Sequence, residues 1–521
     1  MSYEKYRTIN ETFKRELESI RSDYRQQISS AERYINQLKD ETESTDCNDG
    51  FYSAFKKISL SCSNDMLKFS SRIVQSAIRI LAVNPPCSFT SVALGSLARG
   101  EATPYSDLEY LFLIDKETPA TISYFEMLAV TSYFVIGDLG ETKLSYMSIK
   151  ELRGWFDDRA MNGFKIDGLA AGAGLIPTGI GNLNCNQFIV TPNTLLDRYK
   201  AVLDNPAPRE ALRAAISQML KHSKVILEYG SCTLHEKLRK GIQELPLSQE
   251  RKVINVEMLN TDVKKFNFIP SQAGLENRGF SIDVKKEIYR FPSILVLDLN
   301  AIFNIHSENS WETLEIVSSR CLISPGLYDT LKFLLAAAVY IRLSAYLFHN
   351  SHDDRISVAQ TNMKVTTQPR YKATARWYVP SEVFVQMSAK MTYLKLALQQ
   401  ERSIEDLLQS YSCPSANSEL ETLNLLALNS SGRYSEVVQK LNSLCMLTLI
   451  DDPVTSLHQI AANEGLDIPN TMLLAADALF HTGKYRAALL LYTELRGQLN
   501  SYSDGSADDL ARRMVECLYH L

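Results

Sequence analysis

Two short apolar runs near the start of the chain have the length and composition of strands. Residues 89–94 read Phe-Thr-Ser-Val-Ala-Leu, and residues 108–114 read Leu-Glu-Tyr-Leu-Phe-Leu-Ile. Runs of this length, rich in aromatic and aliphatic residues and bounded by turn-forming residues, favour strands. The apolar segment at residues 122–134 then predicts a helix. This part of the chain is therefore expected to mix strands and helices.

Polar, helix-forming sequence precedes these strands. Residues 1–46 contain no Pro or Gly, and their apolar residues recur mostly three or four positions apart: Ile9, Phe13, Leu17, Ile20, Tyr24, Ile28, Tyr34 and Leu38. This stripe predicts a packed helix or a short coiled coil. The sequence Thr-Asp-Cys-Asn-Asp-Gly at residues 45–50 predicts a turn-rich linker, and residues 66–82 predict a second helix.

The pattern beyond about residue 207 is helical. We expect helices over residues 210–228, 253–266, 327–348 and 381–400. The apolar segment 327–348 is interrupted by Arg342, which favours the buried helix of a bundle over a membrane span.

Two similar segments in the tail each place a Gly-basic-Tyr turn between apolar helical runs. They are Gly432-Arg-Tyr434 within residues 423–441 and Gly483-Lys-Tyr485 within residues 474–492. This arrangement is typical of tetratricopeptide-like helical hairpins, but the two glycines are 51 residues apart instead of about 34. The tail is either a docking surface for a protein or a structural cap.

These patterns predict four parts. Residues 1–50 form an amphipathic helix or coiled coil, residues 51–200 a catalytic domain, residues 205–405 a helical bundle that closes a cleft, and residues 415–521 helical repeats. A chain of 521 residues is long enough for such an organisation. The fold class expected is an α+β domain with a mixed sheet, followed by an all-helical region.

The amino-acid composition limits which binding partners and which cellular compartment are expected. The net charge of −5 argues against an extended nucleic-acid surface, although a small basic pocket for a nucleotide is compatible with it. The nine Cys are scattered without a Cys-x-x-Cys pair, which favours a reduced, cytoplasmic location. No secretory signal or membrane span is expected, and export by a signal-independent route would leave the same features.

The strongest chemical signal lies between the two predicted strands. Ten residues separate the pair Gly95-Ser96 from Asp107, and Glu109 follows two positions later. Residues i and i+2 of a strand share a face, roughly 6.6 Å apart along it, so the two carboxylates can hold Mg²⁺ or Mn²⁺. A Gly-Ser turn brings backbone N–H groups close to phosphates.

This sequence motif consists of Leu94-Gly95-Ser96 and Asp107-Leu108-Glu109-Tyr110, with Arg99-Gly100-Glu101 between them. It resembles the motif of the polymerase-β-like nucleotidyltransferases. Within these it is similar to the branch of the protein-PII uridylyltransferases and glutamine-synthetase adenylyltransferases. Glu109 stands where this branch more often has Asp. The resemblance implies transfer of a nucleoside monophosphate from an NTP such as ATP or UTP, with Asp107 and Glu109 as metal ligands.

That family also has a third carboxylate on a neighbouring strand. Asp167, flanked by Ile166 and Gly168, is the preferred candidate for this catalytic and metal-binding role, and Glu141 is its rival. An Asp before a Gly is equally typical of a turn. The Gly-rich residues 170–181 that follow are either a loop over the nucleotide or a connector.

Further basic and hydroxyl residues are candidates for binding the nucleotide. They are Gly95, Ser96, Arg99, Ser106, Lys285 and Arg290. Val284-Lys285 and Arg290 match, in order, residues of the helical domain in the uridylyltransferase branch, but they also suit a basic helix start. Thr103 and Ser106 are expected to order the loop. His349 and His352 are expected in a solvated loop after the apolar helix.

The predicted activity is transfer of AMP or UMP to a hydroxyl group of a protein docked on the helical domains. Two alternatives stay open: transfer to a small molecule or an RNA end, and an inactive scaffold that binds partners through its helical tail.

Overall fold

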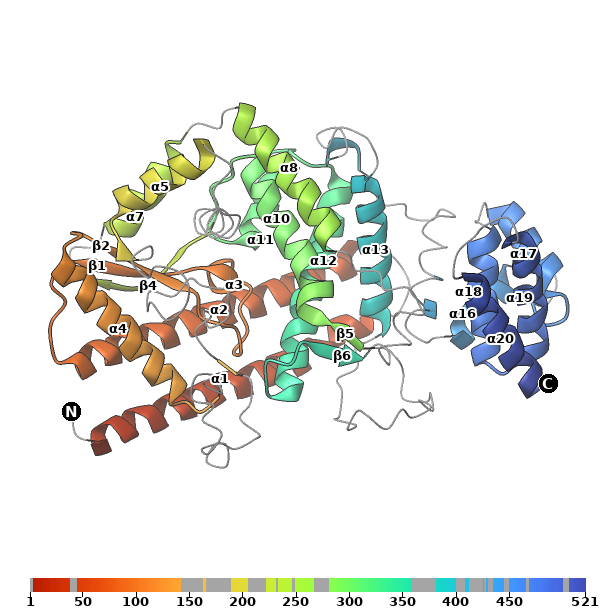
Figure 1. Ribbon diagram of the computed structural model, residues 1–521, viewed down its shortest axis with the longest axis horizontal. Coiled ribbons are helices and arrows are strands. Elements are labelled where there is room, and N and C mark those ends of the chain that lie inside the picture. Colours follow the sequence, from red (N-terminus) through yellow and green to blue (C-terminus); the bar gives the residue numbers. More distant parts are fainter. Residues whose placement is uncertain are drawn as a thin grey trace. The chain divides into compact units, whose positions relative to one another are not determined.

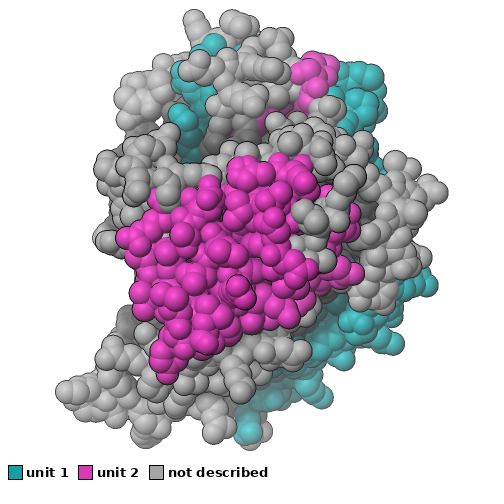
Figure 2. Space-filling model, turned by 90° about the vertical axis from the view of Figure 1, so that its right-hand side faces the viewer, with its two compact units in different colours: residues 1–265, 288–354 teal, residues 266–287, 355–521 magenta. Residues whose placement is uncertain are grey.

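The computed structural model describes residues 3–37, 45–141, 163–164, 189–204, 222–230, 233–245, 249–266, 281–357, 381–399, 408–411, 425, 428–429, 434–444, 449–464, 468–499 and 506–521. The chain forms two compact units. The first comprises residues 1–265 and 288–354, and the second residues 266–287 and 355–521 (Figure 2). The four-part division expected from the sequence stays a prediction.

A four-stranded mixed sheet with the order β3-β2-β1-β4 lies in the first unit. β1 (Phe89–Ala93) pairs antiparallel with β2 (Tyr110–Ile114) and with β4 (Lys224–Tyr229), and β2 pairs in parallel with β3 (Ile189–Val190). Both strands predicted from the apolar runs are confirmed. The register places Ala93 opposite Tyr110, so the end of β1 adjoins the start of β2.

Alternation along β1 and β2 gives the sheet two apolar faces. Phe89 and Phe112 point to one face, where both rings meet Phe125 of α4 (Pro119–Gly137), with centroids 4.9 and 5.3 Å away. Val92 and Leu111 point to the other face and join a buried cluster with residues of α5 (Pro192–Asp204) and α7 (Leu234–Gln243). Figure 1 shows α4 on one side of the sheet and α5 and α7 on the other.

The N-terminal sequence forms two long helices that pack together, α1 (Tyr3–Gln37) and α2 (Thr45–Leu81). The amphipathic stripe is confirmed where Phe13, Leu17 and Tyr24 are buried. The linker predicted at residues 45–50 is wrong, because these residues form the first turns of α2. Thr, Asp and Asn favour helix N-termini as well as turns, so their composition alone did not distinguish the two.

A second correction concerns residues 224–229, which fall at the end of a predicted helix and instead form the edge strand β4. The segment Lys-Val-Ile-Leu-Glu-Tyr has a short apolar run that suits either structure, and pairing with β1 decides it.

The other helices of the first unit are α8 (Gln249–Lys265), α10 (Arg290–Ile302), α11 (Ser310–Ser319) and α12 (Pro325–His349). The predictions at residues 253–266 and 327–348 are confirmed. Two helices, α4 and α12, are long and apolar enough to cross a membrane by length and composition, a test that core helices also pass. The apolar window of α12 is 89% buried within the protein.

The second unit combines a two-stranded sheet with helices. β5 (Ser281–Asp283) pairs antiparallel with β6 (Arg355–Ser357), and the π-helical turn η4 (Val284–Tyr289) follows β5. α13 (Ser381–Gln399) confirms the helix predicted there. Further helices of this unit are α16 (Tyr434–Ser443), α17 (Pro453–Glu464), α18 (Ile468–His481), α19 (Tyr485–Leu499) and α20 (Ser506–His520).

One helical hairpin of the tail matches its sequence pattern. α18 and α19 are separated by a turn in which Gly483 has a φ of +77°, a backbone conformation that glycine adopts readily. α17 lies between this hairpin and α16 in the sequence. The tetratricopeptide-like classification of the tail stays a prediction.

Candidate functional site

The Gly-Ser pair forms the exit of β1. Gly95 begins the four-residue helix α3 (Gly95–Ala98) with a φ of +62°. The backbone N–H of Leu94 donates to the carbonyl of Glu109 over 2.9 Å, which extends the β1–β2 pairing to this point. A Cβ added to Gly95 would lie 1.9 Å from Oε2 of Glu109. The carboxylate of Glu109 therefore packs directly against the backbone of the turn.

Asp107 and Glu109 lie immediately before β2, on either side of the buried Leu108. Both are half-buried, and the Asp107 side chain is 12% exposed. The carboxylate pair and the Gly95 turn predicted from the sequence are thus neighbours, because antiparallel pairing brings the end of β1 to the start of β2.

The loop that joins α3 to Asp107 is fixed by a buried carboxylate. Glu101 accepts hydrogen bonds from the hydroxyls of Tyr289 at 2.5 Å and Ser293 at 2.6 Å, and from Nε of Arg99 at 3.1 Å. Burial by itself raises the pKa of Glu101, but the Arg99 guanidinium and these hydroxyls hold the pKa below its ordinary value. The loop therefore carries an ionised pair inside the protein.

Arg99 also donates from Nη2 to the hydroxyl of Tyr289 over 3.1 Å. Although burial lowers the pKa of Arg99, Tyr289 and Glu101 raise it overall. In this structure the Arg99 guanidinium holds the loop, and its predicted contact with phosphate stays a prediction.

Ser106 lies inside the same loop. Its hydroxyl accepts from the N–H of Thr103 at 2.8 Å and from Nη2 of Arg342 at 3.3 Å. These contacts agree with the loop-ordering role expected of Thr103 and Ser106. Nucleotide binding by Ser106 or Ser96, which is half-buried in α3, stays a prediction.

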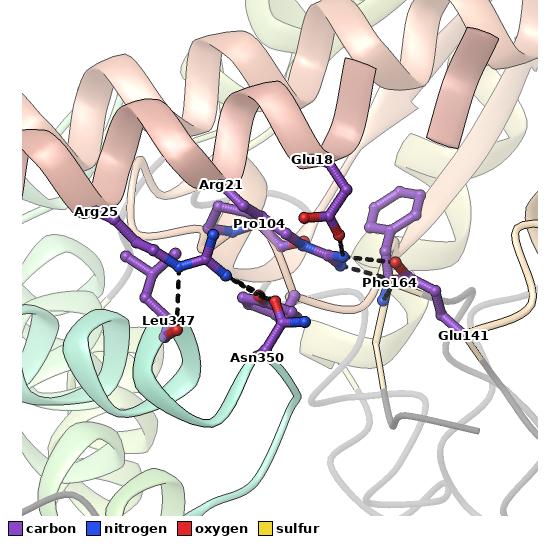
Figure 3. Close-up of polar contacts among 9 residues, drawn as sticks. Glu18, Arg21, Arg25, Pro104, Glu141, Phe164, Leu347 and Asn350 are labelled. Atoms are coloured by element: carbon purple, nitrogen blue, oxygen red, sulfur yellow. Dashed lines mark hydrogen bonds and ion pairs between the residues drawn. The ribbon is translucent and has the colours of Figure 1, made fainter. Parts of the chain in front are cut away.

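The two candidates for the third carboxylate differ in what the structure shows. Asp167 and the Gly-rich segment 170–181 lie outside the described residues. Glu141 receives two hydrogen bonds from the guanidinium of Arg21, at 2.6 and 2.7 Å, and a third from the N–H of Phe164 at 2.8 Å (Figure 3). Its carboxylate thus ties α1 to residues 163–164.

Lys285 and Arg290 are both half-buried and separated by a few residues of sequence. Lys285 belongs to η4 within the second unit, and Arg290 begins α10 in the first unit. Their role at the triphosphate stays a prediction.

His352 is a residue that the sequence analysis placed wrongly. The loop after α12 was expected to be solvated, yet the His352 side chain is 4% exposed and its Nδ1 lies 3.6 Å from Oδ1 of Asp107. This loop follows the apolar helix α12, and its His352 lies in the core. The local sequence around His352 does not indicate its contact with Asp107.

The donors at this site suit a hard cation. Two carboxylates beside a glycine turn offer the oxygen ligands that Mg²⁺ and Mn²⁺ prefer. No group of three or more His, Cys, Asp or Glu that could hold a metal occurs within the described residues. A bound nucleotide or a carboxylate from the rest of the chain would complete the coordination.

The comparison with known families bears on the class of protein. The model of the family described as "Putative nucleotidyltransferase DUF294" matches residues 53–139, which include β1, α3, β2, α4 and most of α2. Among curated proteins, none matches the chain. The match supports a nucleotidyltransferase, and thus a transferase, for the segment that contains Gly95, Asp107 and Glu109.

Proposed function

We propose that this protein transfers AMP or UMP from the corresponding NTP to a hydroxyl group of a protein, with release of pyrophosphate. The observation that carries the proposal is the Glu109 carboxylate packed against the Gly95 turn, with Asp107 two residues away. The family match at residues 53–139 covers all three residues.

Each residue has a role in this reaction. The acceptor oxygen bonds to the α-phosphorus while the bond from that phosphorus to the pyrophosphate oxygen breaks. Backbone N–H groups at Gly95 and Ser96 bind phosphate oxygens. Asp107 and Glu109 hold Mg²⁺ or Mn²⁺, which supplies neutralising charge to the phosphates. The hydroxyl proton passes to a carboxylate base, for which Asp167 is the candidate.

Two observations support a protein acceptor. The tail forms packed helices that include the α18–α19 hairpin, an architecture that commonly binds proteins. The net charge of −5 does not favour an RNA acceptor.

The test is transfer of label from each of the four NTPs, labelled at the α-phosphate, to the protein itself or to a cell lysate with Mg²⁺ or Mn²⁺. We expect one labelled protein band that is lost with Asp107→Asn and with Glu109→Gln. Asp115→Asn is the matched control, because this exposed carboxylate follows β2 at its opposite end.

Label on RNA or on a small molecule would show that the acceptor is not a protein, and the proposed reaction would remain nucleotidyl transfer. Full labelling by the two site variants would overturn the site. A folded protein that binds no metal–NTP and transfers no label would favour the scaffold interpretation.

A further inference from the structure

His352 lies beside Asp107 in the core of the first unit. Nδ1 of His352 is 3.6 Å from Oδ1 of Asp107, and the imidazole is 4% exposed. This separation is a close polar contact, longer than a hydrogen bond. Because the ring is buried, it has few alternative orientations, and it lies against the Asp107 carboxylate.

A second carboxylate and an aromatic ring hold the other side of the imidazole. Nε2 of His352 lies 3.7 Å from Oδ1 of Asp354, which accepts a hydrogen bond from the hydroxyl of Tyr346. The rings of Tyr346 and His352 have centroids 4.7 Å apart. These contacts fix the ring so that Nδ1 faces Asp107 and Nε2 faces Asp354.

Arg342 connects this support to the loop that carries Asp107. Its Nε donates to the Tyr346 hydroxyl over 3.4 Å, and its Nη2 donates to Ser106 over 3.3 Å. Its guanidinium is buried and stacks over the ring of Tyr289 at 4.3 Å. One helix, α12, thus positions both the residue before Asp107 and the surroundings of His352.

We propose that His352 is a positioning residue for Asp107, which restricts the orientation of that carboxylate and so raises the affinity of the site for its divalent cation. This inference rests on the proposed function, since it requires Asp107 to be a metal ligand. Groups that contact a ligating carboxylate typically contribute about 10–100-fold in metal affinity or activity.

Two amide variants separate positioning from simple packing. The amide nitrogen of Asn takes the place of Nδ1, so His352→Asn keeps a polar nitrogen in contact with Asp107. The amide nitrogen of Gln takes the place of Nε2, so His352→Gln keeps the contact toward Asp354 and loses the one toward Asp107. His349→Gln is the matched control, because His349 ends α12 three residues earlier and has no assigned role at the site.

The experiment titrates the full-length protein with Mn²⁺ and follows free Mn²⁺ by electron paramagnetic resonance, with and without a non-hydrolysable NTP. We expect His352→Gln to weaken Mn²⁺ binding by about 10–100-fold, and His352→Asn and His349→Gln to stay close to wild type. In label transfer, His352→Gln should require more Mn²⁺ and regain most of its rate at saturating Mn²⁺.

The outcomes distinguish this inference from the proposed function. Wild-type affinity in His352→Gln, or equal losses in both amide variants, would overturn the positioning role while leaving the proposed function intact. Wild-type protein that binds no Mn²⁺, or binding that survives Asp107→Asn, would overturn the metal site and this inference with it. Should both amide variants fail to fold, Asp354→Asn tests the same orientation from the far side of the ring and is expected to weaken Mn²⁺ binding.

Discussion

At the residue scale, the site depends on the absence of a side chain at Gly95. Glu109 occupies the volume that a Cβ on Gly95 would fill, and Gly95 adopts a left-handed backbone conformation. Both facts require glycine at this position, the first because of contact and the second because of backbone strain.

We therefore expect Gly95→Ala to lower label transfer by about 10²-fold, because displacement of a catalytic group by about 1 Å costs that much. Gly140→Ala is the matched control. Gly140 has a similar φ of +78°, but nothing lies within 4 Å of an added Cβ. Backbone strain should destabilise both variants by roughly 1–2 kcal/mol, which is measured as a lower midpoint of thermal unfolding. Equal activities in the two variants would argue against the role of the Gly95–Glu109 contact.

A buried histidine makes the stability of the first unit pH-dependent. His235 accepts or donates a 2.9 Å hydrogen bond with Ser223, and burial, assisted by Arg239, lowers its pKa from 6.5 to about 4. Below pH 6.5 the unfolded chain binds a proton at this position that the folded protein does not bind, so stability falls as the pH falls toward 4.

Between pH 7 and pH 4.5 this histidine should cost about 2–3 kcal/mol of unfolding free energy, since each unit of pKa shift is worth about 1.4 kcal/mol. His235→Gln removes the titrating group, and its side chain can still pair with Ser223. We expect its unfolding midpoint in urea to change less with pH over this interval than that of wild type. Parallel pH profiles would disprove the assignment.

At the element scale, helix α1 clamps the loops that surround the site. Arg21 pairs with Glu141 and lies over the ring of Tyr105 at 4.0 Å. Nη2 of Arg25 donates to Oδ1 of Asn350 over 2.7 Å (Figure 3). The Tyr105 hydroxyl donates to the same oxygen over 2.6 Å. One turn of α1 therefore holds the Asp107 loop, the Glu141 segment and the loop that carries His352.

Removing one partner of a buried ion pair leaves the other charge without compensation, at a cost of about 3–5 kcal/mol. Arg21→Met should therefore destabilise the first unit by an amount in this range and increase hydrogen exchange in residues 99–106. Arg15→Met, on an exposed position of the same helix, is the control and should change stability by less than about 0.5 kcal/mol. Unchanged exchange in the Arg21 variant would show that α1 does not hold these loops.

At the scale of the whole molecule, both units are built from segments that are separated in the sequence. The second unit joins β5, which precedes α10, to β6 and the C-terminal helices, and the first unit includes α10–α12. The C-terminal helices have their own apolar core. A buried ion pair between Asp477 of α18 and Arg513 of α20, at 2.8 Å, ties the last helix to it, and Tyr492 donates to the same carboxylate over 2.5 Å.

Because this core lies within one unit, Arg513→Met should loosen α20 without affecting the proposed metal site at Asp107 and Glu109. We expect faster hydrogen exchange in residues 468–520, a loss of about 3–5 kcal/mol in that core, and unchanged Mn²⁺ binding. The adjacent Arg512, which pairs with Glu516 on the surface, provides the control variant Arg512→Met. A fall in Mn²⁺ affinity in the Arg513 variant would show that the two units are energetically coupled.

The sequence by itself determined the features that depend on neighbouring residues. Apolar runs and helical periodicity identified β1, β2, α4, α8, α12 and α13, because both patterns reflect the local burial of side chains. The Gly95 turn and the two carboxylates were recognised for the same reason, since a single antiparallel connection of about a dozen residues brings them together.

Only the tertiary structure decided the contacts between distant segments. Pairing with β1 made residues 224–229 an edge strand, and the packing of helices brought Glu141 to Arg21 across 120 residues and His352 to Asp107. The sequence position of a short apolar run, an acidic residue or a histidine does not indicate which distant residue it will contact. That contact depends on how whole helices pack together. The residues of the candidate site were therefore recognisable in the sequence, and the residues that hold them in place were not.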